Sequence, residues 1–262
     1  MKQLLIRADD VGYSYAVNLG IARSVREGLV GSVGVMPNMP ETERGLAWVR
    51  QAAIEAGKTI AIGQHTNVCL GKPCANPDLI PSLLDEEGNF KSSKVFRQSF
   101  KDGVDFVDFD EALIEIEAQY VRFKELVGAE PDYFEAHAVL SNNLIQAITY
   151  VAQKHHLKEQ PVSFDPHKTV LCGSTEVRMA CEDMKLPDEY HPIDFIHRIV
   201  EGMSEKESYV LVFHPGYLDN FILSHSSLTI NRTKEVDALI DPALSRWLKS
   251  KKDLRLIDYR DL

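Results

Sequence analysis

The chain has 262 residues, of which 44% are hydrophobic and 26% are charged, and this composition excludes a disordered or fibrous protein. The formal net charge of −10 at pH 7 argues against a nucleic-acid partner, because proteins that bind a polyanion need clustered Lys and Arg. No window approaches the roughly 20 apolar residues that span a bilayer, and the opening MKQLLIRADD lacks the apolar segment of a signal peptide. We therefore expect a cytoplasmic protein without a membrane partner.

Apolar runs that end in turn residues alternate with segments of helical period, which is the pattern of βα units around a parallel sheet. Strands are predicted at residues 3–8, 32–36, 59–64, 132–136, 162–164, 209–213 and 254–257. Helices are predicted at 16–27 with Gly28 as C-cap, at 110–127 with Asp110 as N-cap, at 141–156 and at 192–202. The stretches 71–108 and 163–190 resist assignment and are expected to be binding loops.

This alternation predicts one α/β domain over residues 1–262, without an internal repeat or a dividing linker. The number of strands favours a (β/α) barrel of TIM type, distorted or incomplete and with elaborated loops, over a doubly wound sheet. Both folds place the active site at the carboxyl ends of the strands.

Five polar residues follow the predicted strands directly: Asp9, Asp10, His65, His137 and His214. In a parallel barrel these strand ends share one rim, so a carboxylate and two imidazoles there could hold a divalent metal with open positions. Each residue also has a simpler interpretation. Asp10 would be the N-cap of the next helix, Asp9 would bond turn amides, and each His would be a hydrogen-bonded rim residue.

Other features narrow the chemistry. No GxGxxG, P-loop or GxSxG motif is present, and the four cysteines form no CxxC pair, so reduced thiols are expected. A Pro-Gly turn follows His214 and is expected to hold Tyr217 and Asp219 near the same rim. His167, His191 and His225 lie in presumed loops, where contact with substrate is the less favoured interpretation.

Three segments, LLIRADDVGYSYAVNLGIARSVREGLVGSVGVMPNMP, AIGQHTNVCLGKP and VFHPGYLDN, occur in an order that resembles the YdjC-like (ChbG-type) carbohydrate deacetylases. The resemblance implies a distorted (β/α) barrel that removes N-acetyl groups from amino sugars such as chitooligosaccharides with a divalent metal. It also implies the roles of five residues: Asp10, His65 and His137 as metal ligands, Asp9 as general base and His214 as general acid. We further expect substrate contacts from Asn38, Tyr217 and Asp219.

One segment departs from that family. Where the family often has DSHxHxH, this chain has EAHAVLS, so His137 is kept while Glu135 replaces Asp. Leu140 and Ser141 stand near the later His positions. The metal set survives this change, but substrate contacts must differ.

The leading hypothesis is metal-dependent deacetylation of an amino sugar or short N-acetylglucosamine oligosaccharide, with its phosphorylation state left open. Mg²⁺ is favoured, with Zn²⁺ or Mn²⁺ as alternatives. A metal-dependent sugar isomerase or phospho-sugar hydrolase on the same barrel is the second hypothesis, and a non-catalytic sugar-binding protein is the third. A homo-oligomer is left open.

Overall fold

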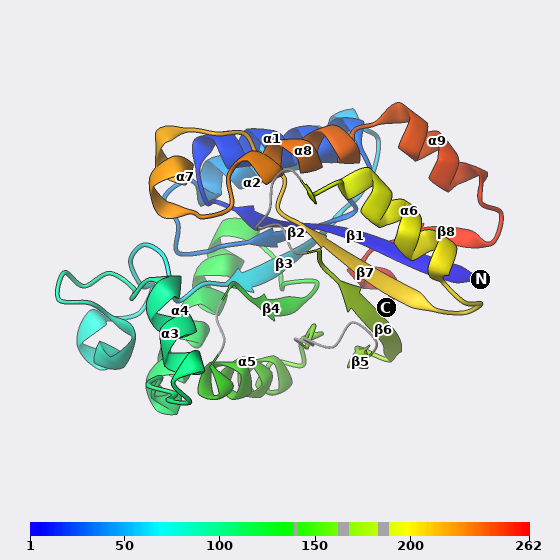
Figure 1. The fold of residues 1–262 in the computed structure, drawn as a ribbon. Coiled ribbons are helices and arrows are strands. Elements are labelled where there is room, and N and C mark those ends of the chain that lie inside the picture. The colour runs from blue at the N-terminus through cyan, green and yellow to red at the C-terminus, as the bar shows by residue number, and fades with distance from the viewer. Residues whose placement is uncertain (139–140, 162–167, 183–188) are drawn as a thin grey trace.

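The computed structural model describes residues 1–138, 141–161, 168–182 and 189–262 (Figure 1). Its strands are β1 (Lys2–Val11), β2 (Ser32–Val35), β3 (Ala61–Thr66), β4 (Phe134–Ala136), β5 (Thr169–Cys172), β6 (Thr175–Ala180), β7 (Ser208–Phe213) and β8 (Leu254–Ile257). Its α-helices are α1 (Tyr15–Glu27), α2 (Thr42–Glu55), α3 (Ser93–Lys101), α4 (Phe109–Val127), α5 (Asn142–Lys154), α6 (Pro192–Gly202), α7 (Asn220–His225), α8 (Ile230–Leu239) and α9 (Pro242–Ser250). Short 3₁₀ helices lie at Pro77–Leu79, Pro81–Leu83 and Tyr259–Asp261.

The described strands form one sheet in the order β4-β3-β2-β1-β7-β6-β5, and β8 pairs with β1. The neighbouring strands run parallel, except that β5 and β6 form an antiparallel hairpin. The sheet curls, with helices on its outside (Figure 1). Since β4 and β5 end the strand order and do not pair with each other in the described part, the barrel is incomplete. The predicted distorted (β/α) barrel is confirmed.

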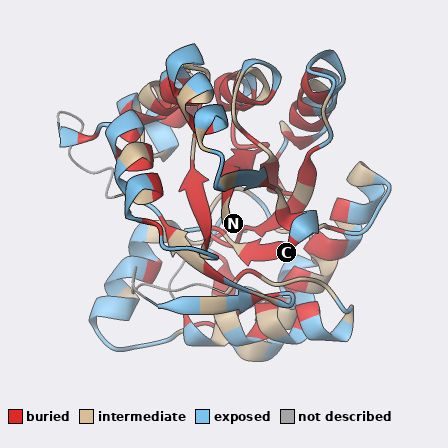
Figure 2. Cartoon of the chain, turned by 90° about the vertical axis from the view of Figure 1, so that its right-hand side faces the viewer, coloured by how far each residue is buried: buried red, intermediate tan, exposed pale blue. Residues whose placement is uncertain are grey.

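The central strands β1, β2, β3 and β7 are the most buried part of the molecule (Figure 2), whereas β5 and β8 are largely exposed. β1 is buried on both faces. Leu4, Ile6 and Ala8 belong to the cluster that packs the sheet against the outer helices. Leu5 belongs to a second cluster in the barrel interior, and Arg7 and Asp9 follow it at two-residue spacing. Because successive side chains of a strand point to opposite faces, the apolar Leu5, the cation Arg7 and the carboxylate Asp9 follow one another along the interior face of β1.

The helices predicted from periodicity are confirmed as α1, α4, α5 and α6. Gly28 is the C-cap of α1, as predicted. The cap of α4 is Asp108 and not Asp110, because the Asp108 carboxylate accepts the amides of Asp110 and Glu111. Ser14 caps α1, so the simpler interpretation of Asp10 as a helix cap is wrong.

The two unassigned stretches contain regular structure: α3 lies in the first and the β5–β6 hairpin in the second. Six predicted strands are confirmed in position, while the strand predicted at 162–164 lies outside the described residues. Among the described residues, no helix is both long and apolar enough to cross a membrane.

Two glycines bring α1 against the loop that follows β7. A Cβ on Gly20 would lie 2.5 Å from the Cα of Gly216, so Gly20 has no room for a side chain, and a Cβ on Gly216 would lie 3.0 Å from Val17. The amide of Tyr217 donates to the Ala16 carbonyl beside this contact. The loop that carries His214 is therefore fixed on the helix that follows the Asp9–Asp10 pair.

Candidate metal centre

Asp9 and Asp10 diverge because β1 is irregular at its end. The β1–β2 register shifts between Ala8 and Val11, and Asp10 has a φ of 78°. A left-handed backbone is costly for a residue other than glycine, and bulges of this kind re-aim side chains next to active sites. Asp9 stays on the interior face and pairs with Arg7 at 2.7 Å. Asp10 points instead toward His65 in β3 and His137 after β4. Asp9 binds Arg7 and no turn amide among the described residues, so the alternative in which it bonds turn amides is not what the structure shows.

His65 and His137 meet the Asp10 carboxylate. The His65 Nε2 and the His137 Nδ1 each lie 3.1 Å from Asp10 Oδ1, and the two nitrogens are 2.8 Å apart. All three residues are buried. Three strand ends thus bring two imidazole nitrogens and one carboxylate oxygen to a single point.

Glu135 orients His65 from the side opposite Asp10. Its Oε1 makes a short contact with His65 Nδ1, and its Oε2 lies 3.5 Å from Arg7. A carboxylate that accepts one imidazole N–H leaves the lone pair of the other nitrogen free for a metal. Gly34 in β2 makes this crowding possible, since a Cβ there would lie 2.8 Å from Asp9 Oδ1 and 3.2 Å from Glu135 Oε1.

The donor set of Asp10, His65 and His137 fits a divalent cation. With Glu135 on Nδ1, the His65 Nε2 lone pair faces the Asp10 carboxylate, and two acceptors at 3.1 Å repel each other unless a cation or proton lies between them. Ligands at about 2.1 Å and at right angles around one ion are about 3.0 Å apart, close to the observed spacing of 2.8–3.1 Å.

The pKa values of His137 and Asp10 also favour positive charge at this cluster. Burial alone would lower the pKa of His137, but the Asp10 carboxylate raises it to about 9. Burial opposes ionisation of Asp10 as well, yet Arg232 and His137 hold the pKa of Asp10 well below its usual value. The cluster is therefore built to keep Asp10 ionised with cationic charge beside it.

Arg232, from α8, is fully buried and ties the centre to the loop after β7. It donates to Asp10 Oδ2 at 2.7 Å and to the carbonyl oxygen of His214 at 3.2 Å. Because Arg232 takes Oδ2, Oδ1 is the Asp10 oxygen that faces the two histidines.

His214 adjoins this centre without joining the ligand set. Its amide donates to Glu235 at 2.6 Å, and its Nδ1 is buried without a hydrogen-bond partner among the described residues. Burial lowers the pKa of His214 to about 4, so its imidazole is neutral at pH 7. The other oxygen of Glu235 accepts from the Tyr190 hydroxyl, which braces the backbone that carries His214.

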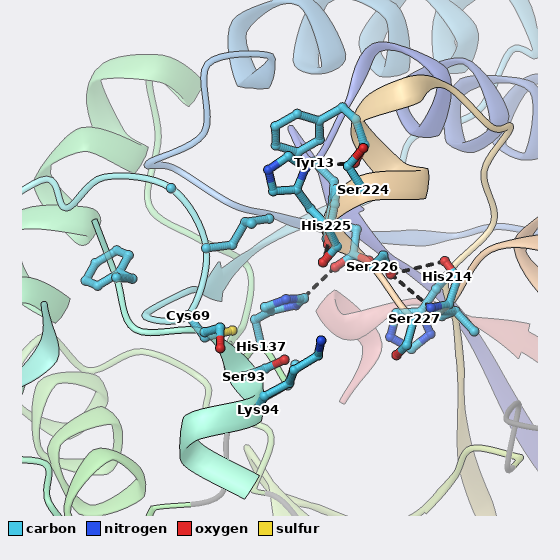
Figure 3. A pocket seen from close by; sticks show the side chains of 18 of the residues that line it. Tyr13, Cys69, Ser93, Lys94, His137, His214, Ser224, His225, Ser226 and Ser227 are labelled. Atoms are coloured by element: carbon cyan, nitrogen blue, oxygen red, sulfur yellow. Dashed lines mark hydrogen bonds and ion pairs between the residues drawn. The ribbon is translucent and has the colours of Figure 1, made fainter. Parts of the chain in front are cut away.

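An outer cavity of about 630 Å³ opens over the centre and is lined by Asp10, His137, His214 and Arg232. Figure 3 shows Ser93 and Lys94 of α3 across this cavity from Ser226 and Ser227. Phe90, Phe221 and Tyr13 add aromatic surface. His225 also lines it, although contact with substrate was the less favoured expectation for that residue. Hydroxyls and aromatic faces together suit a sugar.

The three residues expected to contact substrate lie elsewhere. Asn38 donates to the carbonyls of Leu70 and Lys72, and Tyr217 accepts from Arg23 in a separate surface cavity between α1 and α2. Asp219 caps α7 and also accepts the Ala16 amide. None of the three is among the described residues lining the outer cavity, because each is used to fix a loop.

Sequence reasoning missed Arg7, Arg232 and Glu235. A signal existed for Arg7, since a charged residue two positions before Asp9 within an apolar strand must share its face. Arg232 comes from a helix 222 residues away from Asp10, and no local pattern reveals that pairing.

The curled, mostly parallel sheet and the Asp10–His65–His137 cluster at its strand ends define a barrel-type protein with a candidate metal centre. The chain belongs to the YdjC-like protein family, whose family model matches residues 3–250. The resemblance seen in the sequence is thereby confirmed.

Two relatives that match nearly the whole chain are both described as carbohydrate deacetylases. Carbohydrate deacetylase 2 of Listeria innocua is 29% identical over 262 residues, covering 99% of this chain and 98% of the relative. The carbohydrate deacetylase of Geobacillus stearothermophilus is 28% identical, covering 98% of this chain and 96% of the relative. A crystal structure from Enterococcus faecalis, of a protein proposed to cleave cellobiose phosphate, has a TM-score of 0.81 at 23% identity, covering 99% and 98% of the two chains. That structure supports the fold alone.

Proposed function

We propose that this protein is a metal-dependent deacetylase of an amino sugar or short N-acetylglucosamine oligosaccharide. The observation that carries the proposal is the cluster of Asp10, His65 and His137 beneath a cavity rich in hydroxyl and aromatic groups. The deacetylase relatives support the same reaction class. The three cluster residues would hold the ion, for which we favour Mg²⁺ with Mn²⁺ or Zn²⁺ as alternatives.

When bound, a divalent cation polarises the acetyl carbonyl and lowers the pKa of a water molecule. Asp9 is the residue to accept the proton of that water, because its Oδ1 is buried without a partner among the described residues while Arg7 holds its Oδ2. The water oxygen bonds to the carbonyl carbon, the C–N bond breaks, and acetate and an amine leave.

His214 is the residue placed to give the amine its proton. Because its imidazole is neutral at rest, it must first gain a proton during turnover. Asp9 is the proton source we propose, since Asp9 and His214 both line a second, smaller cavity of about 180 Å³ next to the centre. In this proposal His214 remains the general acid, starting as a neutral imidazole that relays a proton.

Two cations on α3 favour a phosphorylated form of the sugar. Lys94 and Arg97 line the outer cavity, and both side chains are exposed, in a protein whose net charge is −10. A phosphate on the sugar would reach these cations while the acetamide lies at the centre.

The test measures acetate and amine release from N-acetylglucosamine oligosaccharides, with and without a phosphate, after chelation and after readdition of Mg²⁺, Mn²⁺ or Zn²⁺. Stoichiometric acetate and amine, lost on chelation and restored by an ion, support the proposal. Release of phosphate or a ketose instead would favour the hydrolase or isomerase. Sugar binding without turnover under every ion would favour the non-catalytic alternative.

A further inference from the structure

Two cavities meet at the centre. The outer cavity of about 630 Å³ and an inner cavity of about 180 Å³ are both lined by Ala138 and His214. Asp10 and His137 face the outer one, whereas His65 faces the inner one together with Asp9. A group held at the ligand cluster therefore has access to both spaces.

The inner cavity has apolar and polar lining residues. Ala136, Met179 and Val212, from β4, β6 and β7, are apolar, while Arg7, Asp9, Glu135 and Gln160 are polar. Val212 is buried in the interior cluster that contains Leu5, and Met179 packs against that cluster while staying partly exposed.

Two buried polar atoms at this cavity lack partners among the described residues. They are Asp9 Oδ1, on a residue 1% exposed, and His214 Nδ1. A buried polar atom without a partner is costly, so a bound molecule is expected to supply one. The cavity thus suits a small group with both apolar and polar atoms.

We propose that the inner cavity is an acyl subsite, in which Met179 and Val212 limit the length of the acyl chain that is removed. This inference rests on the proposed deacetylase function. An inner volume equal to roughly six water molecules takes an acetyl group more readily than a sugar ring. The outer volume is in the range of sites for larger ligands, so the sugar stays there.

In this arrangement the acyl carbon lies at the junction of the two cavities. The C–N bond breaks there, the carboxylate of the acyl group is left in the inner cavity, and the amine stays with the sugar outside. Each extra methylene must then be fitted against Met179 and Val212. Apolar pockets separate substrates that differ by one methylene by about 10- to 200-fold.

The experiment compares N-acetyl, N-propionyl and N-butyryl forms of one amino-sugar disaccharide, scored by amine release as kcat/KM. Met179→Ala enlarges the cavity at a partly exposed position. Val170→Ala is the matched control, because Val170 packs on the same cluster but is not among the described residues lining the cavity. We expect Met179→Ala to raise the butyryl-to-acetyl ratio about tenfold or more, and Val170→Ala to leave it unchanged.

An unchanged ratio in Met179→Ala, or an equal rise in both variants, overturns the acyl subsite while leaving deacetylation intact. If no variant turns over any sugar, the proposed function fails. Calorimetry then measures the binding constants of the butyryl and acetyl forms, and their ratio is compared between the two variants. Binding that is insensitive to acyl length in both variants, or no binding of any N-acyl sugar, then overturns the subsite as well.

Discussion

Glu135 and Asp10 contact opposite nitrogens of the same imidazole: Glu135 meets His65 Nδ1, and Asp10 Oδ1 lies 3.1 Å from His65 Nε2. Glu135 therefore favours the tautomer in which the Nε2 lone pair is free for a metal. We expect Glu135→Gln to weaken metal binding by about 10- to 100-fold, which is typical when such a partner is lost. Calorimetric titration with Mn²⁺ measures this change.

Glu115→Gln is the control for that variant. Glu115 is also a buried carboxylate, but it accepts the amides of Cys74 and Ala75, away from the metal centre. Equal loss of metal affinity in both variants would show that general destabilisation, and not the tautomer of His65, is responsible.

Asp9→Asn separates proton transfer from metal binding. The amide oxygen can still accept from Arg7, but it cannot take the proton of the attacking water. We expect kcat to fall by about 10²- to 10⁴-fold, with metal affinity changed little. Activity assays and metal titration on the same preparation check both parts, and a parallel loss of metal would contradict the separate roles of Asp9 and Asp10.

Gly34→Ala tests the crowding beneath the centre. The added methyl would lie 2.8 Å from Asp9 Oδ1 and 3.2 Å from Glu135 Oε1, so these carboxylates must move. Overpacking of this kind costs about 1–3 kcal/mol of stability, and we expect activity to fall further than stability explains. Gly31→Ala is the control, because its Cβ would meet nothing closer than 3.5 Å. Normal activity in Gly34→Ala at full metal occupancy would refute the steric argument.

Lys94 and Arg97 are predicted to select a phosphorylated sugar. Replacing both with Ala should raise KM for the phosphorylated substrate at least about tenfold, as expected for the loss of charge-assisted hydrogen bonds. KM for the unphosphorylated form should barely change. Lys101→Ala, on the same helix but not among the described residues lining the cavity, is the control. An equal rise in KM for the phosphorylated and unphosphorylated sugars would contradict the preference for a phosphorylated substrate.

Glu235 should make stability depend on pH. Burial raises its pKa from 4.5 to about 7, so the folded protein holds a proton that the unfolded chain has released. The contribution of Glu235 to the free energy of unfolding is therefore largest below pH 4.5. About 3 kcal/mol of this free energy is lost as the pH rises to about 7. Denaturant unfolding of wild type and Glu235→Gln between pH 4.5 and 8 measures the difference. Parallel curves for the two proteins would contradict it.

The sequence predicts what depends on local pattern. Period and turn residues locate most strands and four helices, and strand ends identify Asp9, Asp10, His65, His137 and His214. The roles of Asn38, Tyr217 and Asp219 could not be judged this way. Position near a motif does not reveal that backbone groups already bind the side chains of Asn38 and Asp219, or that Arg23 donates to the Tyr217 hydroxyl. The hairpin of β5 and β6 was missed because β5 is an exposed edge strand and neither strand shows a clear alternation of buried and exposed residues.

The origin of Arg232 has a consequence for the order in which the centre forms. The three candidate ligands are all present once residue 137 has been made, but the guanidinium that binds Asp10 Oδ2 comes from α8, near the other end of the chain. Closing so long a loop is entropically costly and belongs to late folding. Metal affinity is thus expected to rise only when the last third of the chain docks, which makes bound metal a reporter of completed folding.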